Sequence, residues 1–146
     1  MNARHQQVID LAMGFPMPDV LNRYARDYET SLDYAKRLER ELKRYLTLCA
    51  LNPRKGYAMA GPVDGLWHTF LLFTRLYARF CDQTAGEFLH HEPGDIENEN
   101  ELQRFEEEYA NLWSDYEATF GEPPPDTIWP TFARLCNQDG EEHHPE

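Results

Sequence analysis

Four side chains able to do chemistry lie along an otherwise apolar segment, residues 63–81. At about 100° per residue in an α-helix, Asp64, His68, Arg75 and Arg79 fall within about 80° of one another. Burying a carboxylate, an imidazole and two guanidinium groups is costly unless they pair with one another or contact a ligand. The stripe therefore indicates either an internal ion network or a functional cleft. For Asp64, the favourable field of a helix N-terminus is a further, purely structural explanation.

Two adjacent histidines, His90 and His91, follow this segment after a short turn. Imidazole and carboxylate groups are the usual ligands of zinc and of non-haem iron or manganese. Asp64 and His68 are one helical turn apart and can supply two ligands, while His90 or His91 closes the site from the loop. We therefore expect a site for a divalent metal, most simply zinc, or for a small anionic ligand. The alternatives are that His68 hydrogen-bonds inside a bundle and that the two histidines form an exposed turn.

In an enzymatic version of this site, His68 is a metal ligand or a general base, and Asp64 orients it or shares the metal. Arg75 or Arg79 then holds an anionic substrate. The sequence contains no HExxH motif, no paired CxxC and no glycine-rich phosphate loop, so it does not fix a reaction. Whether the protein is an enzyme stays open at this point.

Cys81 is a further candidate, as a thiolate ligand or a nucleophile. It lies thirteen residues after His68 and therefore about 140° away around a continuous helix. It then projects into the core, and a free buried thiol is the favoured state, as it is for Cys49 and Cys136. Only a break of the helix before Phe80 would let its sulfur turn towards the histidines.

The elements that must position these residues are helices. Apolar side chains recur at helical spacing in three long segments, and no segment shows the alternation typical of strands. Capping residues and proline or glycine stops set the expected boundaries. We expect a compact all-α bundle of about four to five helices, with the helix over 63–81 at its centre. The expected elements are a short helix capped by Asp19, a helix after Thr30 ending at Asn52, the helices over 63–81 and 98–120, and a short element capped by Asp126.

The outer face of the helix after Thr30 carries several charged side chains that we expect to be solvated. They are Lys36, Arg37, Arg40, Glu41, Lys43 and Arg44.

The formal charge is −12, and it is distributed unevenly. Residues 1–81 hold 12 basic and 8 acidic side chains, whereas residues 82–146 hold 2 and 18. Acidic segments repel the phosphate backbone, so direct binding of nucleic acid is disfavoured. The acidic half most simply promotes solubility. The alternative to a ligand site is a non-catalytic interaction module that binds a basic partner protein, and mimicry of DNA is a weaker version of that alternative.

The length of 146 residues fits a single domain, residues 1–146, with a flexible tail over 137–146. The longest stretch without a charged side chain, residues 65–74, is about half of the roughly 20 residues that cross a bilayer. We therefore expect no contact with a membrane. Three cysteines, an odd number, and no signal-peptide pattern favour a cytoplasmic location.

A short pattern within residues 63–93 resembles the glycine-rich domain-containing protein-like family, together with small bacterial proteins that share it. The residues that carry the resemblance are Val63-Asp64-Gly65-Leu66-Trp67-His68-Thr69, Tyr77, Phe80-Cys81, Gly86 and His90-His91-Glu92-Pro93. In plant members the tryptophan is followed by His-Thr-His, whereas Phe70 replaces the second histidine here. The resemblance implies a shared helical core and a shared polar site around Asp64, His68, Cys81 and His90. It implies no reaction.

Overall fold

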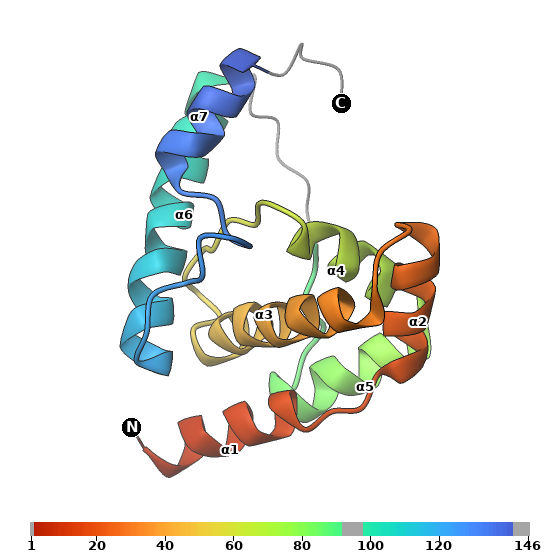
Figure 1. The fold of residues 1–146 in the computed structure, drawn as a ribbon. Coiled ribbons are helices and arrows are strands. Elements are labelled where there is room, and N and C mark those ends of the chain that lie inside the picture. Colours follow the sequence, from red (N-terminus) through yellow and green to blue (C-terminus); the bar gives the residue numbers. More distant parts are fainter. Residues whose placement is uncertain (1, 92–97, 142–146) are drawn as a thin grey trace.

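The computed structural model describes residues 2–91 and 98–141, and across this part the backbone forms helices and connecting loops, without a strand (Figure 1). The all-α class is thereby confirmed. The predicted number of helices is too low, because the N-terminal segment forms a helix and the segment 63–81 forms two. The seven helices of the described residues are α1 (Ala3–Met13), α2 (Pro18–Asp27), α3 (Leu32–Leu51), α4 (Val63–Leu72), α5 (Thr74–Thr84), α6 (Glu99–Phe120) and α7 (Phe132–Glu141).

Helix α3 lies at the centre of the fold, where the sequence predicts the segment 63–81 (Figure 1). It packs against α1, α2, α4 and α6. Leu38, Leu42 and Leu46, spaced one turn apart, are completely buried. The helix begins after Ser31, whose side chain accepts a hydrogen bond from the backbone N–H of Tyr34, so the predicted cap is misplaced by one residue.

The predicted single helix over 63–81 is wrong, because the chain leaves the helical conformation at Phe73. Its φ of −91° and ψ of 70° end α4, and α5 starts at the next residue. A continuous helix over 63–81 would need neighbouring helices along its whole length to cover so wide an apolar surface. The break lets α4 pack against α2 and α3 while α5 packs against α1. The predicted polar stripe is consequently divided between two helices.

The predicted solvated face of α3 is also wrong in part, because Glu41 and Lys43 are buried. The Lys43 ammonium donates hydrogen bonds to the carbonyls of Met13 and Phe15 and pairs with Glu39 at 2.8 Å. These carbonyls lie at the end of α1 and in the turn after it. Through these hydrogen bonds the buried ammonium joins the turn between α1 and α2 to the central helix α3.

The C-terminal part follows the predicted boundaries more closely. Asn98 caps α6, and Gly121 ends it in the left-handed conformation, with φ of 81°. Asp126 does not cap the last helix, because that helix begins only at Phe132, two residues after Pro130. A start near Pro130 agrees with the restriction that a proline places on a helix. Trp129 instead lies in the turn before this helix and is completely buried. The flexible tail stays a prediction, since residues 142–146 lie outside the described part.

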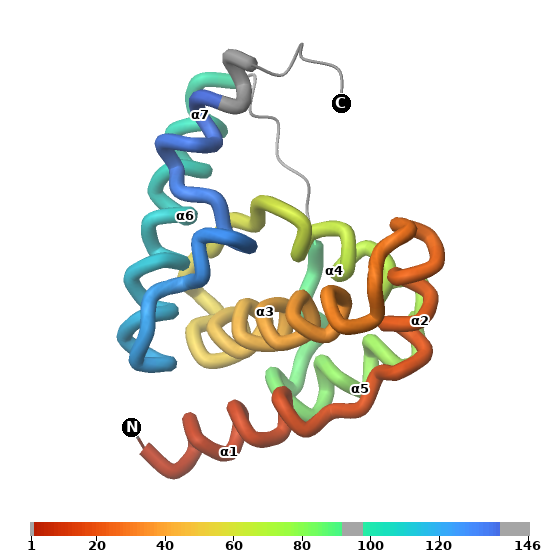
Figure 2. The backbone as a smooth tube through the Cα atoms, viewed as in Figure 1, coloured from red at the N-terminus to blue at the C-terminus, as the bar shows by residue number. Residues whose placement is uncertain are grey.

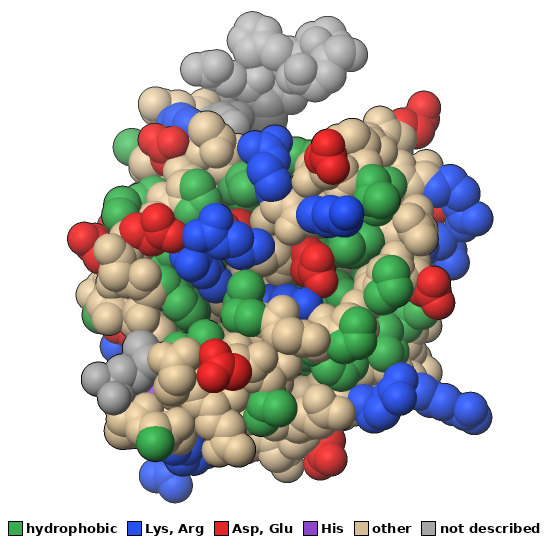
Figure 3. All heavy atoms as spheres, turned by 60° about the horizontal axis from the view of Figure 1, so that its bottom comes forward, with side chains coloured by type: hydrophobic (Ala, Val, Ile, Leu, Met, Phe, Trp, Pro, Cys, Tyr) green, Lys and Arg blue, Asp and Glu red, His purple; other side chains and the backbone are tan. Residues whose placement is uncertain are grey.

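The surface shows no separation of charge on the face formed by the bottom of the view in Figure 1. Lys and Arg side chains lie there between Asp, Glu and hydrophobic side chains (Figure 3). The backbone trace shows α6 and α7 on the opposite side of α3 from α2 (Figure 2). Within the described residues, no helix has the length and apolar character needed to span a membrane. A basic protein partner and the exclusion of nucleic acid both remain predictions.

Candidate functional site

The first two residues of the candidate site come from the N-terminal half of α4. Asp64 lies in its first turn, and His68 lies one turn later. Asp64 Oδ1 and His68 Nε2 are 3.7 Å apart, and both side chains are partly exposed to solvent. The helix therefore presents a carboxylate and an imidazole side by side at the protein surface.

His91 joins them from the segment that follows α5, which runs back past α3 towards α4 (Figure 2). Its Nε2 lies 2.7 Å from Asp64 Oδ1, within hydrogen-bond distance. The His91 ring stacks on Trp67, with centroids 4.1 Å apart and planes 1° apart, and on His68 at 4.7 Å and 16°. Only 11% of the His91 side chain is exposed. His91 is thus the least exposed member of a cluster whose other imidazole is open to solvent.

Hydrogen bonds to the backbone of Leu89, two residues before His91, fix the path of this segment. The backbone N–H of Leu89 donates to Cys81 Sγ at 3.4 Å, and its carbonyl accepts a hydrogen bond from the hydroxyl of Tyr77. The same hydroxyl accepts a hydrogen bond from Trp67 Nε1 at 3.1 Å. Because Trp67 also stacks on His91, one buried network holds both the backbone before His91 and the surface under its ring.

The electrostatic state of the cluster is set by Asp64. The hydrogen bond from His91 lowers the pKa of the Asp64 carboxyl, and the charge of nearby His68 adds to this, while partial burial opposes it. The carboxyl is therefore ionised at neutral pH. An ionised carboxylate between two imidazoles is an attractive position for a cation.

The distances among the three groups suit a small metal ion. One ligand atom from each of Asp64, His68 and His91 can be chosen so that all three lie within 4.8 Å of one another. Ligand atoms bonded to a tetrahedral zinc ion at about 2.0 to 2.1 Å lie roughly 3.3 Å apart. The two carboxylate–imidazole distances, 2.7 and 3.7 Å, lie on either side of this value. Metal binding at Nε2 of His91 would replace its hydrogen bond with Asp64 and would require the tautomer that carries the proton on Nδ1.

Other residues predicted for the site lie elsewhere. His90 is exposed, and its ring contacts Phe88 at 4.9 Å, because neighbouring side chains on an irregular segment point in different directions. Arg75 and Arg79 are exposed on α5, beyond the break at Phe73, and Arg79 lines a separate surface cavity next to α1. The structure therefore does not bring either arginine to the cluster.

Cys81 is buried and acts as a hydrogen-bond acceptor for the loop. Burial raises the pKa of its thiol, although the hydrogen bond from Leu89 opposes this, so the thiol is protonated near neutral pH. The helix does break before Phe80, as a turn of the sulfur towards the histidines would require. Even so, the sulfur bonds to the backbone two residues before His91 and does not join the cluster of ligand atoms.

Sequence reasoning missed the positioning roles of Trp67 and Tyr77. Both belong to the apolar surface of the segment 63–81, which predicts only that they are buried, and both are buried. The signal available in the sequence was chemical: buried Trp and Tyr side chains need hydrogen-bond partners for their polar ends. That need does not identify the partner, because Leu89 contributes backbone atoms and its residue type carries no information about them.

A family model named UCP032817-like matches residues 6–114, and the chain belongs to this family. The resemblance to the glycine-rich domain-containing protein-like family is therefore wrong as an assignment. That resemblance rested on a pattern within residues 63–93, whereas the matching model spans most of the chain. Comparisons with curated proteins and with solved structures found no match. The name of the matching family states no activity.

Proposed function

We propose that this protein binds a divalent metal ion, most simply zinc, through Asp64, His68 and His91. The observation that carries the proposal is the convergence of one carboxylate and two imidazoles from segments more than twenty residues apart in sequence, with ligand atoms within 4.8 Å. Two histidines and one carboxylate are a ligand set used by zinc enzymes and by non-haem iron sites. The absence of a thiolate from the set favours zinc or another borderline ion over a copper(I) site.

The architecture supports a site with an open coordination position. Three protein ligands leave a fourth tetrahedral position for water or a bound molecule. His68 is 56% exposed, so that position has access to solvent, while His91 is held by stacking and by the network below it. Zinc bound in this way lowers the pKa of a coordinated water and supplies a hydroxide near neutral pH. In this proposal Asp64, His68 and His91 hold the ion. The molecule that reaches the open position decides which reaction follows.

The test is the metal content of protein purified without a nickel column and dialysed against zinc. We expect about one zinc per chain by elemental analysis. His91→Ala removes the buried ligand and should abolish binding, whereas His90→Ala changes the adjacent exposed imidazole and should leave the content unchanged. Zinc well below one per chain in the unmodified protein, or equal zinc in the two variants, would refute the proposal.

A further inference from the structure

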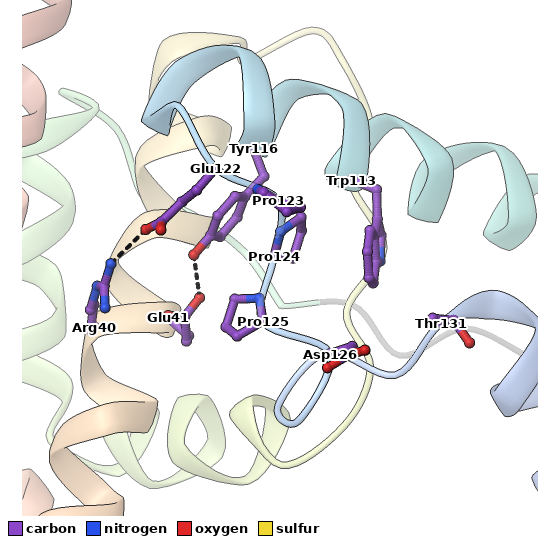
Figure 4. Close-up of a pocket in the computed structure, with 10 residues that line it drawn as sticks. All are labelled: Arg40, Glu41, Trp113, Tyr116, Glu122, Pro123, Pro124, Pro125, Asp126 and Thr131. Carbon is purple, nitrogen blue, oxygen red and sulfur yellow. Dashed lines mark hydrogen bonds and ion pairs between the residues drawn. The ribbon is translucent and has the colours of Figure 1, made fainter.

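A cavity of about 480 Å³ lies between α3, α6 and the segment that follows α6 (Figure 4). Its volume falls within the roughly 300 to 1,000 Å³ that is usual for sites of small molecules. The wall combines the aromatic side chains of Trp113 and Tyr116 with three consecutive prolines, 123–125. Two further lining residues, Glu41 and Asp126, are carboxylates for which the described residues provide no ion pair. The remaining lining residues are Thr131 and the paired Arg40 and Glu122. None of these residues belongs to the cluster of Asp64, His68 and His91.

Glu41 is the unusual member of this wall, because it is a carboxylate with only 2% of its surface exposed. Its Oε1 accepts hydrogen bonds from the hydroxyl of Tyr116 at 2.7 Å and from Trp129 Nε1 at 3.0 Å. Both donors are neutral and both use the same oxygen, so Oε2 is left out of the two bonds. A buried carboxylate is costly unless a positive charge compensates for it.

The nearby arginines are already occupied. Arg40 pairs with Glu122 at 2.7 Å at the edge of the cavity (Figure 4). Arg44 pairs with the same carboxylate at 2.8 Å. Arg44 also donates to the hydroxyl of Tyr116 at 2.9 Å and so directs the hydroxyl proton towards Glu41. The guanidinium groups thus neutralise Glu122 and orient Tyr116. Against the opposing effect of burial, the charge of Glu41 helps to raise the pKa of Arg44, but no ion pair joins Glu41 to either arginine.

We propose that this cavity binds a small organic amine in its ammonium form. The ammonium would donate to Glu41 Oε2, with Asp126 adding attraction at the surface. The face of the Trp113 ring suits a cation, and the prolines and the aromatic rings suit a compact apolar body. The proposal is independent of metal binding, since it uses other residues from other helices.

The experiment compares phenethylamine with 2-phenylethanol, which has nearly the same shape and no charge. Binding is measured by protein-observed NMR, with the indole signal of Trp113 as the local reporter. We expect the amine to saturate the site with Kd below about 10 mM and the alcohol to bind at least tenfold more weakly. Absence of saturable amine binding, or equal binding of the alcohol, would overturn the proposal.

Variants locate the binding. Glu41→Gln keeps an oxygen acceptor for Tyr116 and Trp129 while it removes the charge, and it should weaken amine binding about tenfold. Asp126→Asn is an exposed change that does not touch the buried network, and it should weaken binding about threefold. Glu117→Gln removes an exposed carboxylate of α6 that does not line the cavity, and it should have no effect. If Glu41→Gln does not fold, the Asp126→Asn result decides, and binding unchanged by Asp126→Asn overturns the proposal.

Discussion

Removal of the Tyr116 hydroxyl should destabilise the protein more than the loss of a single oxygen atom suggests. Tyr116 is completely buried, and its hydroxyl links a guanidinium to a carboxylate: it accepts from Arg44 and donates to Glu41. Hydrogen bonds to charged groups contribute about 1.5 to 3 kcal/mol each. In the variant, Arg44 keeps its hydrogen bond to Glu122, so the loss of its bond to the tyrosine hydroxyl costs little. Glu41, in contrast, would retain only the hydrogen bond from Trp129. We therefore expect Tyr116→Phe to lower the free energy of unfolding by about 2 to 3 kcal/mol.

The assay is urea denaturation followed by circular dichroism. With a slope of about 2 kcal/mol per molar urea, the midpoint should fall by roughly 1 to 1.5 M without a change in slope. Tyr28→Phe is the matched control, because Tyr28 is 51% exposed and the same atom is removed from a solvated ring, which should cost less than about 0.5 kcal/mol. Surface substitutions change the free energy of unfolding by less than about 0.5 kcal/mol. If Tyr116→Phe changes it by no more than that, Glu41 does not depend on the tyrosine hydroxyl as a donor.

Three further predictions concern the metal cluster and the turns. Zinc at about 100 times its Kd should stabilise the protein by about 2.7 kcal/mol, which differential scanning calorimetry would show as a higher melting temperature; His91→Ala should remove the shift and His90→Ala should preserve it. The pKa of the Asp64 carboxyl is lowered in the folded state, so the unmodified protein should be more stable than Asp64→Asn above pH about 4. This advantage should be lost as the pH falls through the pKa of Asp64 in the folded state. The free energies of unfolding of both proteins, measured in urea over the acid range, would contradict the prediction if they depended on pH in the same way. Gly61→Ala should lower the free energy of unfolding more than Gly86→Ala in the same assay. Both glycines have positive φ, but only at Gly61 would a Cβ lie 2.8 Å from a carbonyl oxygen, that of Ile128. Equal losses of stability in the two variants would show that the backbone at Ile128 moves aside.

The helices of this protein were largely predictable, because their apolar positions repeat at a helical period. Helix α6 is the clearest case, with its Asn98 cap and its Gly121 stop both where expected. The break at Phe73 was not predictable from the same signal, since both α4 and α5 continue one apolar pattern. What ends α4 is the position of the neighbouring helices, α2 and α3 beside α4 and α1 beside α5. Those contacts exist only in the folded chain.

The charged residues of α3 illustrate a second limit. Helical spacing puts Glu41 and Lys43 at opposite edges of the polar face, about 160° apart around the helix. The structure buries them because segments distant in sequence cover that face: Phe15 and the preceding turn over Lys43, and Tyr116 and Trp129 over Glu41. A pattern of residue types along one helix cannot show which part of its polar face another segment will cover. Buried charges with dedicated partners are therefore where sequence reasoning missed a second candidate site.

The choice between His90 and His91 shows how the cluster of Asp64, His68 and His91 depends on groups that are not among the three proposed ligands. Both are histidines of one loop, and only His91 reaches Asp64. The backbone of Leu89, tied at its N–H by Cys81 and at its carbonyl by Tyr77, determines which of the next two side chains faces α4. Trp67 then fixes the ring of that side chain by stacking. Since preorganised ligands lose less freedom on binding, the affinity of the proposed site should depend on Tyr77 and Trp67 as well as on the three ligands.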